Sequence, residues 1–364
     1  MIFPPREAFK VAGQEDGVGL KLLTVRGDEM LVLAIETSCD DTAAALVEGG
    51  KRVLSSFVSG QEEVHRRYGG VVPELASRHH IQNIVPVVKG ALEEACKGWE
   101  ELDGVAVTRG PGLVGSLLVG ISLGKAIAYA LGLPLVGVNH LMGHLMAIFL
   151  EKEVPFPFIG LVASGGHTSL YLVKGYLDVS LLGATRDDAA GEAFDKVAKH
   201  LGLGYPGGRV IEALARKGDP AAIPFPRAYL GPDSLEFSFS GVKTAVVQFL
   251  RSHRVTERDL PDIAASFQEA IIDVLISKAI KAAEIYRIPR VVVAGGVASN
   301  LRLRERLQEA AAERGIEAAF PSPHLCTDNA AMIGVVGYHL LLKGRMDGWE
   351  MNALSRWPLP EEGR

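Results

Sequence analysis

Two histidines, His140 and His144, lie four residues apart in the apolar stretch VNHLMGHLMAIFL. Residues at this spacing share one face of a helix, so the two imidazoles are placed to bind one zinc or iron ion. Two histidines buried in a core helix would show the same spacing. A metallopeptidase of the H-E-x-x-H type has a glutamate after the first histidine, whereas Leu141 occupies that position here, so the base of such an enzyme is missing.

Two polar turns between expected strands are further candidate sites. The first, ETSCDDT, holds the carboxylates of Glu36, Asp40 and Asp41 and favours a polar loop in a cleft, although a solvated hairpin also favours such residues. The second, VASGGHTSL, contains Gly165 and Gly166, whose backbone N–H groups can surround a phosphate because no side chain blocks the approach. A hairpin turn without a ligand is the simpler alternative for the glycine pair.

Three later segments combine polar side chains with turns. In RDDAAGEAFDKVAKHLGLGYPGG, the acids Asp188 and Glu192 would repel each other on one helical face, which favours bound ribose hydroxyls or a cation over a solvated face. In VVVAGGVASN, the glycines end a buried strand, where ligands dock in α/β sheets, and Asn300 can bond a base or a sugar. Asp328 lies at or near the start of the last helix and either caps it or donates a carboxylate to a metal.

The expected elements occur twice in the same order. Three strands are expected within residues 31–58 and again within 156–183, each set followed by helices and further buried strands. This duplication predicts an α/β fold of the actin-like ATPase (sugar kinase, heat-shock 70, actin) type, with two lobes and a nucleotide in a central cleft. The first lobe is expected at 30–150, completed by a helix at about 329–344, and the second at 151–328.

The composition limits the remaining alternatives. The net charge of the 364 residues is −5, so a nucleic-acid partner requires a local basic patch, for which HRRYGG, SRHHIQ and LRLRERLQ are candidates. The three cysteines are widely spaced, and no run of 18 apolar residues stands out, which predicts a cytoplasmic protein without a membrane span. Residues 1–29 precede a second methionine, Met30, and are interpreted as a disordered extension or as untranslated.

Ten segments together resemble one known family in sequence and order. They are LAIETSCDDTAAALV, YGGVVPELASRHH, GPGLVGSLLVG, VNHLMGH, LVASGGHTSL, DDAAGEAFDKVAKHLGLGYPGG, FSFSGVKTAV, DIAASFQEA, GGVASNLRLR and CTDNAAMIG. The chain is similar, from about Leu31 to about Gly344, to the bacterial tRNA adenosine threonylcarbamoyltransferases, formerly called O-sialoglycoprotein endopeptidases. Such enzymes have the actin-like fold. They transfer the L-threonylcarbamoyl group from threonylcarbamoyl-AMP to the exocyclic amine of the adenosine 3′ of the anticodon, in tRNAs that read codons beginning with A, and release AMP.

The resemblance also implies site residues. One divalent metal ion, iron in the family with zinc as the alternative, would be held by His140, His144 and Asp328. Substrate contacts would come from the segment Val162, Ala163, Ser164, Gly165 and Gly166 and from Asp195, Gly208 and Asn300. Glu212 replaces a family aspartate and is one methylene longer. No general base is assigned, and Glu36, Asp40 and Asp41 are the catalytic candidates.

The implied partners are tRNA, an inactive paralogous subunit and a small P-loop ATPase, with no membrane. Three other functions are alternatives to the transferase: an actin-fold ATPase or phosphotransferase, a metallopeptidase, and a scaffold without activity. The His–His–Asp set disfavours an ordinary sugar kinase, which would hold magnesium with carboxylates and water.

Overall fold

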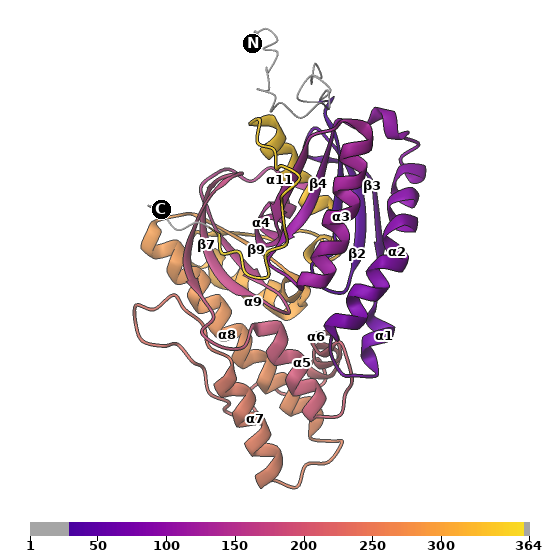
Figure 1. Cartoon of the computed structure of the whole chain (residues 1–364). Coiled ribbons are helices and arrows are strands. Elements are labelled where there is room, and N and C mark those ends of the chain that lie inside the picture. The colour runs from indigo at the N-terminus through magenta and orange to yellow at the C-terminus, as the bar shows by residue number, and fades with distance from the viewer. Residues whose placement is uncertain (1–28, 360–364) are drawn as a thin grey trace. The chain divides into compact units, whose positions relative to one another are not determined.

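The computed structural model describes residues 29–359, which divide into two compact units (Figure 1). Unit 1 comprises residues 29–61, 72–152 and 328–358, and unit 2 comprises 62–71, 153–327 and residue 359. The N-terminal extension expected at 1–29 lies, apart from Glu29, outside the described residues.

Unit 1 is a five-stranded sheet with helices on both faces. Its strands lie in the order β3-β2-β1-β4-β5; β1, β2 and β3 are antiparallel, whereas β1, β4 and β5 are parallel. The elements are β1 (Leu31–Glu36), β2 (Thr42–Glu48), β3 (Arg52–Ser59), α2 (Pro73–Glu94), β4 (Gly104–Gly110), α3 (Val114–Leu131), β5 (Leu135–Asn139), α4 (His140–Met146) and α11 (Ala330–Leu342), with short 3-10 turns at Trp99–Glu101 and Ala147–Leu150.

Alternation along β1 places its side chains on two faces, because successive residues of a strand point to opposite sides. Ile35 packs toward α3, where a Cβ on Gly120 would lie 3.5 Å from its side chain. The neighbouring Ala34 faces α11, where a Cβ on Gly334 would lie 3.4 Å from it. Strand β1 is therefore buried on both faces, and it pairs in parallel with β4, as β4 does with β5.

Unit 2 repeats the topology of unit 1. Its order is β10-β9-β6-β7-β8, with β6, β7 and β8 antiparallel and β6, β9 and β10 parallel. The elements are α1 (Glu62–Arg66), β6 (Phe158–Ala163), β7 (Thr168–Gly175), β8 (Asp178–Ala184), α5 (Ala190–His200), α6 (Gly207–Ala215), α7 (Ser240–Ser252), α8 (Leu260–Tyr286), β9 (Arg290–Ala294), α9 (Leu301–Ala312), β10 (Glu317–Ala319) and α10 (Pro323–Cys326), with a 3-10 turn at Gly296–Ser299. The predicted duplication of an α/β unit is confirmed.

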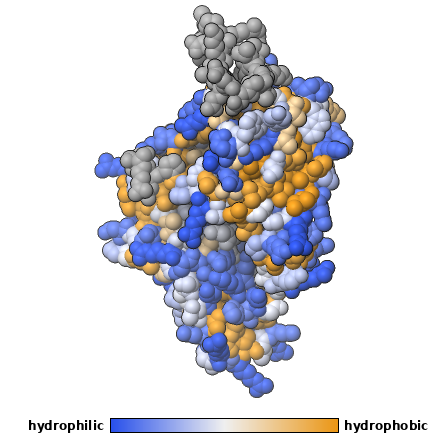
Figure 2. Space-filling view, viewed as in Figure 1, coloured by the Kyte–Doolittle hydropathy of each residue, from blue (hydrophilic) through white to orange (hydrophobic). Residues whose placement is uncertain are grey.

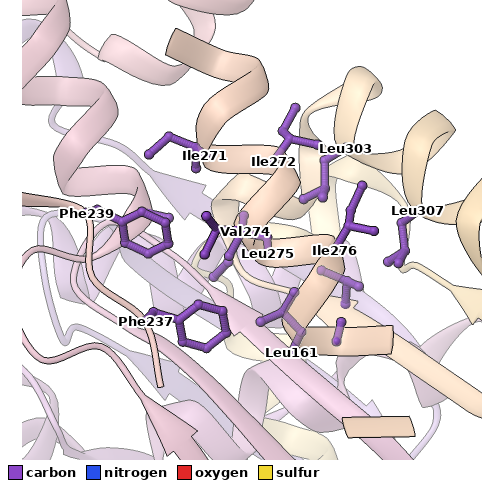
Figure 3. Close-up of a cluster of buried hydrophobic side chains, with 14 of the residues drawn as sticks. Leu161, Phe237, Phe239, Ile271, Ile272, Val274, Leu275, Ile276, Leu303 and Leu307 are labelled. Carbon is purple, nitrogen blue, oxygen red and sulfur yellow. The ribbon is translucent and has the colours of Figure 1, made fainter. Parts of the chain in front are cut away.

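The core of unit 2 forms around the long helix α8. Figure 3 shows Leu161 of β6 and the rings of Phe237 and Phe239 beside the aliphatic side chains of α8. Leu303 and Leu307 reach the same cluster from α9. Because α8 is buried along most of its length, it holds the β6 end and the α9 start in one rigid arrangement.

The structure contains helices that the sequence-based expectation lacks. Helices α1, α6 and α7 were not predicted, since α1 is short and glycine begins α6. Helix α3, which was expected as a long helix, is long and apolar enough to cross a membrane by length and composition. In the structure one side of α3 packs against β4 and α2 of unit 1.

Candidate functional site

The helix that carries the two histidines begins directly at the end of β5. Asn139 caps it, because its side-chain oxygen accepts hydrogen bonds from the backbone N–H groups of Leu141 and Met142 at 2.9 and 3.3 Å. The Asn139 Nδ2 donates to the carbonyl of Trp357 at 2.8 Å. The C-terminal segment thus fixes the cap, and the cap fixes the direction of α4.

His140, His144 and Asp328 lie together in unit 1, with one potential ligand atom of each within 4.8 Å of the others. Asp328 Oδ1 is 3.2 Å from His144 Nε2 and 3.5 Å from His140 Nε2. Asp328 does not cap α11, because the neighbouring Asn329 accepts the hydrogen bond from Met332 N at 3.0 Å. Its carboxylate is therefore directed to the two imidazoles.

The chemistry of this group fits a metal ion. The His144 side chain is fully buried, and neither ring nitrogen makes a hydrogen bond among the described residues, although Nε2 faces Asp328. Burial, together with the positive charge of His140, lowers the pKa of His144, which keeps its imidazole in the neutral form that metals bind. Two imidazole nitrogens and a carboxylate oxygen match the donors of zinc or iron.

His140 has a different environment, because its Nδ1 is already occupied. Glu36 Oε2 lies 3.0 Å from this nitrogen and Ser38 Oγ 3.1 Å from it. Burial alone would lower the pKa of His140, but the carboxylates of Asp328 and Glu36 raise it to about 9. Burial would likewise raise the pKa of Glu36, yet His140 outweighs this effect and lowers it.

The three catalytic candidates of the acidic turn differ in exposure. Glu36 is fully buried, whereas Asp40 and Asp41 are half-buried in the bend after β1. His80 of α2 holds this turn, with Nδ1 2.8 Å from Thr42 Oγ1 and Nε2 3.0 Å from the Cys39 carbonyl. The turn is thus a fixed loop rather than a solvated hairpin.

The glycine-rich turn of unit 2 is closed by its own backbone. Ser164 N donates to the His167 carbonyl at 2.8 Å, and Gly191 N at the start of α5 donates to the Ser164 carbonyl at 3.1 Å. A Cβ on Gly165 or Gly166 would meet no atom within 4 Å, so open space adjoins both. The turn can therefore accept a ligand against its backbone.

A chain of contacts links the other predicted substrate residues to this turn. On α5, Asp195 Oδ1 accepts a hydrogen bond from Gly207 N at 2.7 Å, which places Asp195 beside Gly208 at the start of α6. On α6, Glu212 Oε1 accepts from Leu301 N at 3.0 Å, next to Asn300. Gly295, which precedes the turn that leads to Asn300, lies against the glycine-rich turn, because a Cβ on Gly295 would lie 2.4 Å from the Ala163 carbonyl oxygen. Unit 2 thus brings all the predicted substrate residues into one continuous arrangement.

Asn300 has structural partners for both ends of its amide. Its oxygen accepts from Leu303 N at 3.0 Å and caps α9, and its Nδ2 donates to Gln268 Oε1 at 2.7 Å. Gln268 and Glu212 both line a pocket of about 460 Å³ between α6, α8 and α9. Asn300 therefore serves at least to position the start of α9.

The interpretation of Asp188 and Glu192 as repelling acids on one helix was wrong. Helix α5 begins at Ala190, so Asp188 precedes it. Lys196 lies between the two acids, 2.7 Å from Asp188 and 2.8 Å from Glu192, and Lys243 lies 2.6 Å from Asp188. Lysines therefore compensate both charges, and no cation is needed.

The segment LRLRERLQ, a candidate basic patch, uses its arginines within unit 2. Arg302 and Arg306 both pair with Glu269, and Arg306 also pairs with Asp273. Arg304 donates to the carbonyls of Ala298 and Pro321. Arg302 and Arg306 thus stabilise the α8–α9 contact, and Arg304 holds the segments on either side of α9 and β10, which disfavours a nucleic-acid surface on this segment.

Comparison with known sequences identifies close relatives. Residues 52–335 match the family described as tRNA N6-adenosine threonylcarbamoyltransferase. A protein of that name from Syntrophus aciditrophicus is 55% identical over 337 residues, covering 92% of this chain and 99% of the relative. Another, from Geobacter metallireducens, is 58% identical over 332 residues, covering 91% and 97%.

Solved structures share the fold at low sequence identity. HypF of T. kodakarensis aligns with a TM-score of 0.61 and 16% identity, over 87% of this chain and 48% of that one. Component A of (R)-2-hydroxyglutaryl-CoA dehydratase from Acidaminococcus fermentans aligns with a TM-score of 0.51 and 17% identity, over 85% and 98%. The actin-like fold is thereby confirmed.

Proposed function

Since the chain belongs to the family of tRNA N6-adenosine threonylcarbamoyltransferases, it is a tRNA-modifying transferase, and we propose that His140, His144 and Asp328 hold one metal ion on which the transfer depends. The observation that carries this proposal is the pair of unbonded, buried nitrogens of His144 beside Asp328. A metal bound there supplies a Lewis acid that takes up charge on substrate oxygens. We propose Fe²⁺, which the family resemblance implies, with Zn²⁺ as the alternative, and both metals accept this donor set.

The substrates are tRNA and threonylcarbamoyl-AMP, a mixed anhydride whose carbamoyl carbon is already activated. In the proposed reaction the N6 amine of the adenosine 3′ of the anticodon attacks this carbon and loses one proton. The bond to the phosphate oxygen breaks and AMP leaves. The main task of the protein is then orientation, which can supply about 7–11 kcal/mol for a well-aligned pair.

Unit 2 provides the groups that would hold the adenylate. The open Gly165–Gly166 turn exposes backbone amides to a phosphate, and Asp195 on α5 and Asn300 at the start of α9 belong to the same arrangement. Glu212 reaches Leu301 N with its longer side chain, so it positions the α9 start whether or not it touches substrate.

Gly208→Ala separates ligand contact from folding. A Cβ at this position meets no atom within 4 Å, so we expect stability to be unchanged or raised by about 0.5–1 kcal/mol, as for a helical Gly→Ala exchange. If substrate approaches this backbone, AMP affinity falls. Gly241→Ala, at the same position in α7 and equally open, is the control in calorimetric AMP titrations. Equal AMP affinity of the two variants would refute a contact at Gly208.

We also propose that an inactive paralogous subunit binds unit 1 on α2 and α3, and that a small P-loop ATPase joins the assembly. Figure 2 shows hydrophobic side chains gathered over these helices. Ile81 and Val85 on α2 are 65% and 45% exposed, and Val114 and Leu118 on α3 are 46% and 39% exposed. Each pair is four residues apart and shares a helical face, which suits helix packing against a partner.

The double variant Ile81→Asp/Leu118→Asp tests this surface. Residues at the centre of an interface cost about 2 kcal/mol or more on truncation, so we expect the affinity for the paralogous subunit to fall at least about 30-fold. Analytical ultracentrifugation of the mixed proteins measures this affinity. Ile285→Asp, an exposed apolar position on α8 of unit 2, is the control and leaves association intact. Wild-type association of the double variant would place the partner elsewhere.

We place the protein in the cytoplasm, where its substrate tRNA occurs. None of its three cysteines, Cys39, Cys96 and Cys326, forms a disulfide, as expected in a reducing compartment.

A further inference from the structure

One carboxylate at the metal group has no access to solvent. Glu36, the last residue of β1, is 0% exposed, and both its oxygens already accept hydrogen bonds. Oε2 accepts from Thr108 Oγ1 of β4 at 2.6 Å, and Oε1 accepts from the backbone N–H of Ser38. Burial of a carboxylate costs free energy unless such partners compensate its charge. The presence of Glu36 at this buried position therefore indicates a specific structural or functional role.

The remaining contact of Glu36 is with His140. Oε2 lies 3.0 Å from His140 Nδ1, whereas Nε2 of the same ring faces Asp328 at 3.5 Å. Because the carboxylate accepts at both oxygens, Nδ1 must carry the hydrogen that joins the two side chains. In the neutral ring this leaves the lone pair on Nε2, which is directed into the His–His–Asp group.

We propose that Glu36 is a positioning residue that fixes the tautomer and ring orientation of His140, so that Nε2 is presented to the metal ion. This inference rests on the metal site proposed above. Thr108 completes the connection by holding the carboxylate from the neighbouring strand. Glu36 is accordingly not the general base, since its buried oxygens have no free approach for a substrate proton.

The two histidines therefore differ in how they are held. Glu36 and Ser38 contact His140 at Nδ1, the ring nitrogen that does not face Asp328. His144 Nδ1 has no hydrogen-bond partner among residues 29–359. A carboxylate behind a metal-binding histidine raises its basicity, and loss of such a partner costs about 10- to 100-fold in metal affinity. Metal binding through His140 should consequently depend on Glu36. The metal affinity can be measured without the transfer reaction.

Glu36→Gln keeps the side-chain volume but can present an amide N–H to Nδ1, which would move the imidazole hydrogen to Nε2. We expect the dissociation constant for Zn²⁺, measured by calorimetric titration of the metal-free full chain, to rise about 10- to 100-fold. Asp103→Asn is the matched control, because Asp103 is a buried carboxylate of the same unit that accepts from Leu31 N at the opposite end of β1. Its Zn²⁺ affinity should equal that of the wild type.

His140→Ala distinguishes the possible failures. If Glu36→Gln binds Zn²⁺ like the wild type while His140→Ala does not, the positioning role is refuted and the metal site stands. If His140→Ala also binds normally, the metal site itself is refuted. Should Glu36→Gln not fold, Thr108→Val retains the carboxylate and removes its hydroxyl donor. A weakened Zn²⁺ affinity of this variant supports the inference, and an unchanged affinity overturns it.

Discussion

We expect His140→Ala and Asp328→Asn each to lose bound metal and transfer activity together. His140 and Asp328 supply two of the three donor atoms gathered within 4.8 Å, so either change leaves too few ligands for a stable site. Loss of a residue that only hydrogen-bonds to a metal ligand lowers activity by up to about 100-fold. Loss of a ligand itself should lower the transfer rate by more than this. Metal content by mass spectrometry and threonylcarbamoylation of tRNA are measured on the same preparations.

His339→Ala is the control for these variants. His339 lies on α11, the helix that follows Asp328, but it is outside the metal group, and burial lowers its pKa to about 4. This variant should keep both metal and activity. Full metal occupancy in His140→Ala or Asp328→Asn would contradict the ligand set, whereas metal loss in all three variants would indicate general damage to unit 1.

We expect Gly191→Ala to lower both stability and AMP affinity strongly, because α5 begins in direct contact with the glycine-rich turn. A Cβ at Gly191 would lie 2.6 Å from the Ser164 carbonyl oxygen and 2.9 Å from Gly165 Cα, both of which are backbone atoms. The turn or the helix must move, at a cost of about 1–3 kcal/mol for overpacking. We expect a lower free energy of unfolding in urea and a large loss of AMP affinity, since the turn loses its position.

The control is again Gly241→Ala, the second residue of α7 as Gly191 is the second residue of α5. Space around Gly241 is open, so the extra methyl group should leave stability and AMP binding intact. If Gly191→Ala unfolds and binds AMP like the wild type, the contact between α5 and the turn is not needed for the substrate site.

The sequence predicts well where local signals determine structure. The acidic turn before Thr42 and the turn at Gly165–Gly166 are bounded by apolar runs, and both join antiparallel strands in the structure. The duplicated topology follows from the repeated order of such runs. By contrast, helix α6 begins with Gly207, which gives no helical start signal.

The arrangement around the histidines could not be predicted from local sequence. Glu36 and His140 are 104 residues apart, and Thr108 reaches the same carboxylate from another strand. Asp328, 184 residues beyond His144, was associated with the histidine pair by family resemblance alone. Asn139 was missed as the cap of α4, although an asparagine directly before a helical segment is a recognisable N-cap signal.

The most direct test of the account compares metal-free and metal-reloaded protein in reconstituted transfer. Threonylcarbamoyl-AMP, unmodified tRNA, the paralogous subunit and the P-loop ATPase are supplied, and the modified nucleoside is read by mass spectrometry. We predict N6-threonylcarbamoyladenosine with the reloaded wild type, little with the metal-free protein, and no restoration of His140→Ala by added metal. Equal product from metal-free and reloaded protein would contradict the proposed role of the His140–His144–Asp328 group.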